Sequence, residues 1–204
     1  MRIVSGLKAL AIACVLGFST ITVAQAVEML PMEPVGEDGL HKEEWFQETF
    51  LDLKEDATDA AAEGKQLLVI WEQVGCPFCA MTHEVNLRDP RIVKYIQDNF
   101  FVVQMNLKGD REVIDFDGTA RSEKDQAKFA NMRLTPVMQF FPADPAESEG
   151  KSGKDATAFS VPGYWSPEHF LNQFVYVRSG AYKTEKSFLA WYRKGEGLVK
   201  LDDL

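Results

Sequence analysis

The sequence predicts an α/β protein whose central mixed β-sheet is flanked by helices, with helical extensions at the N-terminal and C-terminal ends. Two apolar runs of strand length, residues 67–71 and 101–107, are separated by segments with helical spacing, which is typical of parallel strands. A later apolar segment, residues 135–141, is followed by a loop and a short return strand, which indicates a hairpin in the same sheet. The composition, with 46% hydrophobic and 26% charged residues, is that of a globular protein.

The first 26 of the 204 residues have the pattern of a secretory signal peptide. Arg2 and Lys8 accompany an apolar stretch over residues 9–18, which is too short to span a bilayer, and Ala24-Gln25-Ala26 is a small-x-small cleavage site. We therefore expect an exported protein. Ala11-Ile12-Ala13-Cys14 loosely resembles a lipobox, so we expect a membrane anchor only if Cys14 is lipidated.

Residues 27–204 are expected to form a single domain, because a chain of this length can bury one sizeable core. Residues 27–39 are rich in Pro, Glu and Gly and are expected to be a loose N-terminal arm. Residues 41–63 carry apolar side chains and then an Ala-rich run before Gly64, which indicates one or two helices. The continuous apolar run over residues 67–71 suits a buried central strand.

Cys76-Pro77-Phe78-Cys79 follows this strand directly. Proline is tolerated in the first turn of a helix, so we expect a helix that starts at this motif and extends to about Val85. Asp89-Pro90 is a typical cap and first position of the next helix, which leads into the strand over residues 101–107.

The second half of the chain is punctuated by caps and turn residues. Residues 108–121 are expected to form a polar loop. Its acidic part, Asp110 to Asp117, is expected to be solvated, because Asp115-Phe116-Asp117-Gly118 lacks the spacing of a calcium-binding loop. The remaining predicted elements are a short helix from Ser122, a strand over residues 135–141, a loop over 142–157, a return strand over 158–161, a helix from Ser166, and a final helix near 184–193.

Charge and cysteine content exclude two broad classes of protein. The formal net charge of −9 provides no basic surface for nucleic acid. Three cysteines are too few for a disulfide-stabilised scaffold. Once the signal peptide is removed, Cys76 and Cys79 are the two that remain.

The Cys76–Cys79 pair suits thiol–disulfide exchange. At a helix N-terminus, free N–H groups and the helix dipole stabilise a thiolate, so we expect Cys76 to attack a partner's disulfide. Cys79, one turn later, is expected to resolve the mixed disulfide, and the roles would be exchanged only if Cys79 were the more exposed. A purely structural disulfide is a poor alternative, because so short a loop constrains the unfolded chain little.

The chain resembles the thioredoxin superfamily. The stretch that carries the resemblance is Trp71-Glu72-Gln73-Val74-Gly75-Cys76-Pro77-Phe78-Cys79, with Thr135-Pro136 opening a later strand. Over about residues 50–182 it also resembles the SoxW-type periplasmic thioredoxins associated with sulfur-oxidation systems. The further motifs of that resemblance are the signal peptide, Glu72-Gln73-Val74-Gly75-Cys76-Pro77, His83-Glu84-Val85-Asn86, Asp110-Arg111-Glu112-Val113, Asp115-Phe116-Asp117-Gly118 and Pro162-Gly163-Tyr164.

The resemblance implies specific roles around the cysteine pair. Pro136 would be a cis-proline that faces the pair, and Thr135 would offer backbone groups to an extended substrate, whereas an ordinary trans-proline is the alternative. Pro77 and Phe78, between the cysteines, are the other expected substrate contacts, and half-buried packing is an equal alternative for Phe78.

Two positions depart from the family pattern. Gly75 replaces the usual tryptophan, and Ile70 stands at the position of the buried acid that assists deprotonation of the resolving thiol. Either Glu72 or a water molecule would take over that role. The Pro-Phe dipeptide between the cysteines also differs from the Gly-Pro of ordinary thioredoxins, and this dipeptide tunes the redox potential.

The resemblance therefore implies a periplasmic oxidoreductase that reduces disulfides in exported partner proteins, including those of a sulfur-oxidation system. A membrane thiol-electron donor would supply its electrons, and no flavin or nucleotide motif indicates a bound cofactor. A disulfide oxidase or isomerase is the alternative within redox chemistry.

An alternative of another class is a copper(I) carrier that uses Cys76, Cys79 and His83. The spacing lacks a fourth ligand, and His83 is more typical of a helix surface, so we expect no metal. Haem attachment is excluded because Ala80 follows the second cysteine.

Overall fold

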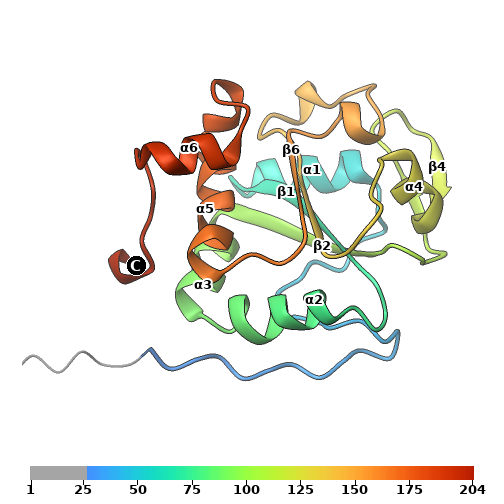
Figure 1. The fold of residues 1–204 in the computed structure, drawn as a ribbon. Helices are drawn as coiled ribbons and strands as arrows, with labels where there is room; N and C mark the ends of the chain where they lie inside the picture. The colour runs from blue at the N-terminus through green and yellow to red at the C-terminus, as the bar shows by residue number, and fades with distance from the viewer. Residues whose placement is uncertain (1–26) are drawn as a thin grey trace, which may run out of the picture.

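The computed structural model describes residues 27–204, so the signal-peptide pattern and Cys14 lie outside the described residues. Among residues 27–204, no helix is long and apolar enough to cross a membrane. A central sheet with helices on both faces makes up the fold (Figure 1), as the sequence predicts.

Four strands form the central sheet in the order β2-β1-β5-β6. β1 (Gln66–Glu72) is parallel to β2 (Phe100–Asn106), because a helical connection returns the chain to the same end of the sheet. β5 (Val137–Phe140) is antiparallel to β1, and β6 (Phe159–Pro162) is antiparallel to β5. The predicted mixed sheet, including its C-terminal hairpin, is confirmed.

The helices around the sheet in residues 27–204 include α1 (Leu53–Ala62), α3 (Pro90–Asn99), α4 (Glu123–Phe129) and α5 (Pro167–Arg178), and α6 (Phe188–Lys194) packs on α5. Side chains of β1 alternate between two apolar cores. Leu68 and Ile70 join the core that contains residues of α3, α5 and α6, whereas Val69 and Trp71 join the core that contains residues of α1 and α4. This alternation of period two buries both faces of β1 and explains why its sequence is continuously apolar.

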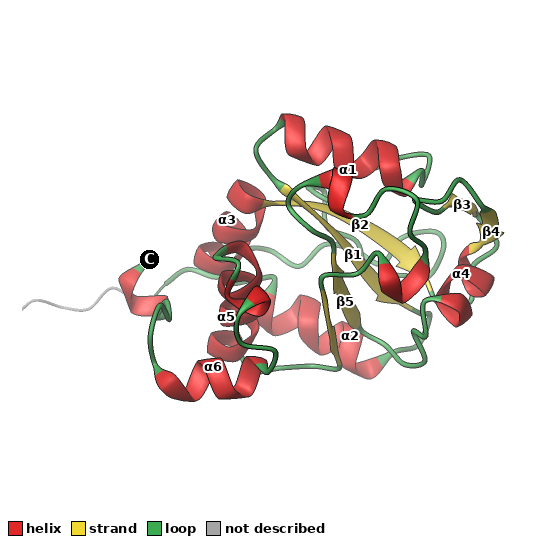
Figure 2. Ribbon diagram, turned by 90° about the horizontal axis from the view of Figure 1, so that it is seen from above, coloured by secondary structure: helices red, strands yellow, loops and turns green. Residues whose placement is uncertain are grey.

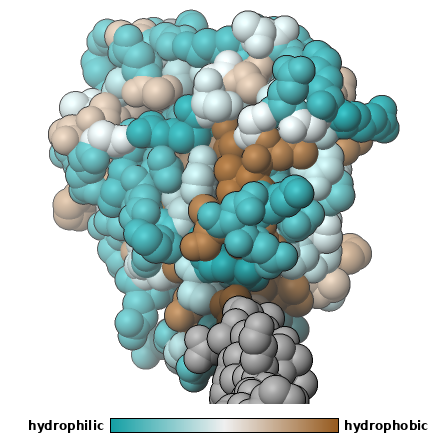
Figure 3. All heavy atoms as spheres, turned by 90° about the vertical axis from the view of Figure 1, so that its left-hand side faces the viewer, coloured by the Kyte–Doolittle hydropathy of each residue, from teal (hydrophilic) through white to brown (hydrophobic). Residues whose placement is uncertain are grey.

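The two layers of helices lie on opposite sides of the strands. Seen from above, α1 is on one side of the strands and α5 is on the other (Figure 2). The face that carries the C-terminus is hydrophilic over most of its area, with an apolar area near its middle (Figure 3).

Helix starts follow the sequence signals. The Asp89 carboxylate accepts a hydrogen bond from the backbone N–H of Arg91, with Pro90 at the first position of α3. The Ser122 hydroxyl accepts one from the N–H of Asp125 at the start of α4. The predictions for these two helices are confirmed.

Residues 41–52 differ from the prediction of one or two helices over residues 41–63. Only α1 is helical in that range, because Leu51 has a φ of 60°, a left-handed conformation through which a right-handed helix cannot continue. Trp45 and Phe46 nevertheless pack against the core on the α3 and α5 side. Their apolar spacing therefore reflects burial rather than a helix.

Residues 108–121 differ from the polar loop with a solvated acidic part that the sequence predicts. They contain a small antiparallel hairpin, β3 (Glu112–Ile114) with β4 (Ala120–Ser122). Asp115 between these strands is buried, and its carboxylate accepts hydrogen bonds from Gln126 Nε2 at 2.7 Å and Gly153 N at 2.8 Å. The prediction is wrong for Asp115 because these partners come from distant parts of the chain.

The N-terminal segment, residues 27–52, runs along the protein beside the helix of the cysteine motif, α2 (Pro77–Met81) (Figure 1). Leu30 N donates to Arg88 O at 2.7 Å, and Arg88 Nε donates back to Leu30 O at 2.8 Å. Val35 and His41 form an isolated antiparallel bridge. A side chain at Gly39 would contact Val74 in the loop before Cys76, so this segment reaches the cysteine motif.

Candidate active site

Cys76 and Cys79 lie where β1 ends and α2 begins, and they form a disulfide. Cys76 is the N-cap residue of α2, and its Sγ accepts a hydrogen bond from Cys79 N at 3.0 Å. After α2 the helix continues as a π-helical turn, Thr82–Asn86. The helix therefore ends within one residue of the predicted end at about Val85. A sulfur that receives a backbone N–H at a helix start is stabilised as a thiolate.

Exposure distinguishes the two cysteines. Cys76 is 7% exposed and Cys79 is 1% exposed, so Cys76 is the more accessible of the two cysteines. An attacking thiol must reach the partner's disulfide, whereas a resolving thiol attacks only its neighbour. The geometry fits the roles that the sequence predicts, which stay predictions.

Thr135 and Pro136 lie opposite the cysteine pair, although they are about sixty positions away in sequence. The Thr135–Pro136 peptide bond is cis, as the resemblance implies. Thr135 Oγ1 donates a hydrogen bond to Cys76 Sγ at 3.2 Å. Thr135 therefore contacts the Cys76 sulfur through its hydroxyl. The sequence prediction for Thr135 concerned only its backbone groups, so this contact was missed.

Exposed apolar side chains accompany the motif. Phe78, between the cysteines, is 53% exposed, which fits both the predicted partial exposure and the half-buried alternative. Val74, Met81 and Leu134 are also exposed, and each lies within a few positions of a site residue. Clustered exposed apolar side chains are typical of surfaces that dock other proteins.

Gly75 adopts a conformation that suits glycine. Its φ is +73°, in the left-handed region, and nothing lies within 4 Å of where a Cβ would be. The backbone conformation, rather than lack of space, therefore explains why the tryptophan expected from the family pattern is replaced here.

Glu72 and His83 form a buried ion pair beside the motif. Glu72, the last residue of β1, is 1% exposed, and His83, four residues after Cys79, is 2% exposed. His83 Nε2 lies 3.1 and 3.2 Å from the two Glu72 carboxylate oxygens. On its other side, His83 Nδ1 lies 2.7 Å from Glu43 Oε1, in the N-terminal segment.

These contacts decide the charge of His83. Burial lowers the pKa of the imidazole, but the hydrogen bonds to Glu43 and Glu72 outweigh burial and raise the pKa to about 9. His83 is therefore an imidazolium between two carboxylates at neutral pH. The expectation that His83 lies on a helix surface is wrong, because these partners satisfy both ring nitrogens inside the protein.

The same contacts weaken the copper-carrier alternative. A histidine ligand must offer a free ring nitrogen, whereas both nitrogens of His83 are occupied by carboxylates. In the part of the chain that the structure describes, no group of three or more His, Cys, Asp or Glu residues is arranged to hold a metal ion.

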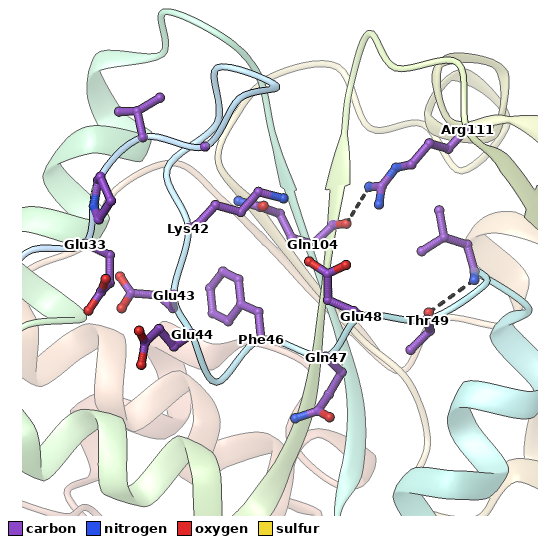
Figure 4. A pocket seen from close by; sticks show the side chains of 14 residues that line it. Glu33, Lys42, Glu43, Glu44, Phe46, Gln47, Glu48, Thr49, Gln104 and Arg111 are labelled. Carbon is purple, nitrogen blue, oxygen red and sulfur yellow. Dashed lines mark hydrogen bonds between the residues drawn. The ribbon is translucent and has the colours of Figure 1, made fainter.

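A cavity of about 350 Å³ opens between the N-terminal segment and β2. Gln104, an inward-facing residue of β2, lines it and donates hydrogen bonds to Glu72 Oε2 at 2.5 Å and to His41 O at 2.6 Å. Glu33, Glu43 and Glu44 lie to one side of Phe46 in this cavity, and Arg111 to the other (Figure 4). Neither cysteine lines the cavity.

Comparisons with known proteins give one family match and several similar solved structures. A family model described as a thioredoxin-like domain matches residues 53–178, which extend from the first residue of α1 to the last of α5. A search of curated proteins finds no match. Solved structures similar to this chain include a thioredoxin-fold protein from Helicobacter pylori, with 19% identity and a TM-score of 0.47, covering 71% of this chain and 91% of that one. Another is a thioredoxin from Thermus thermophilus, with 17% identity and a TM-score of 0.48, covering 66% of this chain and 90% of that one.

Proposed function

Because the chain belongs to the thioredoxin-like domain family, we propose that it is a periplasmic thiol–disulfide oxidoreductase that reduces disulfides in exported proteins. One observation carries the proposal: the Cys76–Cys79 disulfide lies at the start of α2, with Cys76 the more exposed and in contact with Thr135. The signal-peptide pattern supports the location.

The reaction follows from the arrangement of the two sulfurs. In the reduced protein, the Cys76 thiolate attacks one sulfur of the partner's disulfide, and the partner's other sulfur leaves as a thiolate and takes up a proton. Cys79, after losing its proton, then attacks Cys76 Sγ, so the Cys76–Cys79 disulfide forms and the partner's first sulfur leaves. The partner gains two electrons and two protons, and both electrons come from the cysteine pair.

The disulfide present in the structure is the product of that cycle. A dithiol donor must reduce it before the next turnover, and we propose a membrane protein that passes electrons by thiol exchange. We further propose that the partners belong to a sulfur-oxidation system, on the strength of the SoxW-type motifs such as Glu72-Gln73-Val74-Gly75-Cys76-Pro77.

The exposed apolar side chains beside the motif supply the docking surface for a partner. Phe78 and Val74 lie next to Cys76 in sequence and are more than half exposed, so an extended segment of the partner can cover them while its disulfide reaches Cys76. The chain's net charge of −9 favours partners whose docking surface is not strongly acidic.

A trapping experiment tests the function. We expect Cys79→Ser, expressed with its export signal, to accumulate disulfide-linked complexes through Cys76, because the resolving step is lost. The double variant Cys76→Ser, Cys79→Ser is the control and should trap nothing. Mass spectrometry identifies the partners, and recovery of sulfur-oxidation proteins supports the reductant proposal. Recovery of newly secreted, misfolded chains would instead favour an oxidase or isomerase.

A purified-protein assay tests the chemistry directly. The wild-type protein should catalyse the reduction of a protein disulfide by dithiothreitol, and Cys76→Ser should abolish catalysis. Catalysis that persists in Cys76→Ser would refute the assigned mechanism.

A further inference from the structure

We propose that Glu43, supplied by the N-terminal segment, is a positioning residue that sets the redox equilibrium of Cys76 and Cys79 through the buried pair His83 and Glu72. This inference rests on the proposed function. It assigns a role in that function to Glu43, which lies outside the family match to residues 53–178.

Glu43, His83 and Glu72 form a continuous chain of three ionisable groups. Glu43 Oε1 lies 2.7 Å from His83 Nδ1, and His83 Nε2 lies 3.1 Å from Glu72 Oε1. The side chains of His83 and Glu72 are almost fully buried, and that of Glu43 is mostly buried. An imidazolium between two carboxylates carries a net charge of −1, and burial makes that charge act over a longer range than it would in water.

The chain of groups lies close to the sulfurs. His83 follows Cys79 by four residues, in the π-helical turn that continues α2, and residues four apart along a helix are neighbours on its surface. Side chains on a helix lean toward its N-terminus, so we expect the imidazole to lie on the side of the turn that carries Cys79. Glu72 ends the strand that leads into Cys76.

The N-terminal segment forms one wall around His83. Besides Glu43, the His41 ring stacks on the His83 ring with centroids 5.2 Å apart, and Phe46 contacts it edge-on at 6.0 Å. From the sheet side, Gln104 of β2 donates hydrogen bonds to Glu72 Oε2 and to His41 O. Gln104 therefore connects the N-terminal segment to the ion pair. The titratable groups that face His83 are therefore Glu43 and His41 from the segment and Glu72 from β1.

Charge then gives the direction of the effect. A thiolate near a buried net charge of −1 is disfavoured, and disfavouring the thiolate disfavours the reduced form of the pair. Neutralising Glu43 changes the charge of the group of three from −1 to 0. The reduced form is then stabilised, and the protein becomes more oxidising.

The test is the equilibrium of the full-length exported protein with a glutathione redox buffer, measured for wild type and variants. At an effective dielectric of about 20 and a separation of about 10 Å, removing one charge is expected to shift the equilibrium constant about tenfold toward the reduced form. A tenfold shift of a two-electron couple corresponds to 29.6 mV. Glu43→Gln should show this shift and a lower pKa of the Cys76 thiol, measured by the pH dependence of its alkylation.

A matched control distinguishes position from charge. Glu44→Gln removes the neighbouring carboxylate of the same cavity, which makes no hydrogen bond to His83, and should leave the equilibrium within about twofold of wild type. His83→Gln should shift the equilibrium in the opposite direction from Glu43→Gln. The double variant, which restores a net charge of −1, should return toward wild type.

Equal equilibrium constants for Glu43→Gln, Glu44→Gln and wild type would overturn the proposal. If His83→Gln fails to fold, the comparison of the two glutamate variants decides the question alone. The glutathione equilibrium reports on the cysteine pair itself. A protein that shows the predicted Glu43 shift but reduces no exported protein would overturn the proposed function and not this inference.

Discussion

Stability should fall as the pH rises from 7 to 9.5, and His83 should be the cause. In the unfolded chain a histidine has a pKa of about 6.5, whereas the two carboxylate partners raise the pKa of the buried His83 to about 9. The folded state therefore holds a proton that the unfolded state has already released. The stabilisation is fully present below pH 6.5 and is lost as the pH rises through about 9.

The size of the effect follows from the difference between the two pKa values. One pKa unit is worth about 1.36 kcal/mol, so the shift from 6.5 to about 9 corresponds to about 3 kcal/mol of unfolding free energy. That amount is a large fraction of the stability of an ordinary domain. Urea unfolding of the disulfide-bonded protein at pH 6, 7, 8, 9 and 9.5 measures it, and the oxidised cysteines do not titrate in this range.

Two variants isolate the contribution. In His83→Gln the decline between pH 7 and 9.5 should be absent, and the stability at pH 6 should be lower than that of wild type because Glu43 and Glu72 lose their charged partner. His169→Gln, a change at a histidine that stacks on Tyr192 outside this group, should keep the wild-type decline. A decline of the same size in wild type and His83→Gln would refute the reasoning.

Three further predictions concern single residues. Gly75→Ala should lower the unfolding free energy by about 1–2 kcal/mol in urea, because φ is +73° at that position; an unchanged value would contradict the cost of the left-handed conformation. Asp56→Asn should stabilise the protein by about 2 kcal/mol more at pH 8 than at pH 5. Burial raises the pKa of Asp56 to about 7, against the opposing hydrogen bond from Thr49, so the stability that the protonated carboxyl contributes is lost as the pH rises from 4 to 7. Equal gains in stability at both pH values would exclude this raised pKa. Thr135→Val should raise the pKa of the Cys76 thiol and slow its alkylation at pH 7 several-fold, because the hydroxyl that donates a hydrogen bond to Sγ is removed. An unaltered pH profile of alkylation would show that this hydrogen bond does not stabilise the thiolate.

Local signals were sufficient for the sheet and for the cysteine pair. The apolar run over residues 67–71 predicts a strand because both of its faces are buried, and the structure extends β1 by one residue at each end. The proline of the motif predicts a helix start at Cys76 because its missing N–H costs nothing there. Both signals act within a few residues.

Long-range contacts explain the failures. Glu43 and His83 are 40 positions apart, and nothing near either residue indicates that they meet. Glu72 alone gave a signal, as an acidic residue directly after an apolar strand and before the motif. Trp45 and Phe46 contribute to the apolar content that suggested a helix, but they are apolar because the core on the α3 and α5 side covers them.

The segment that supplies Glu43 also covers an outer edge of the sheet. β2 is an outer strand, and Gln47 pairs with it: Gln47 N donates to Val102 O at 2.7 Å, and Gln47 and Val103 form a parallel bridge. An uncovered strand edge with the sequence Phe100-Phe101-Val102-Val103 is a template for pairing with another chain. The segment before α1 thus covers part of this edge through Gln47, and we expect a chain that lacks the segment to self-associate more readily as well as to lose a partner of His83.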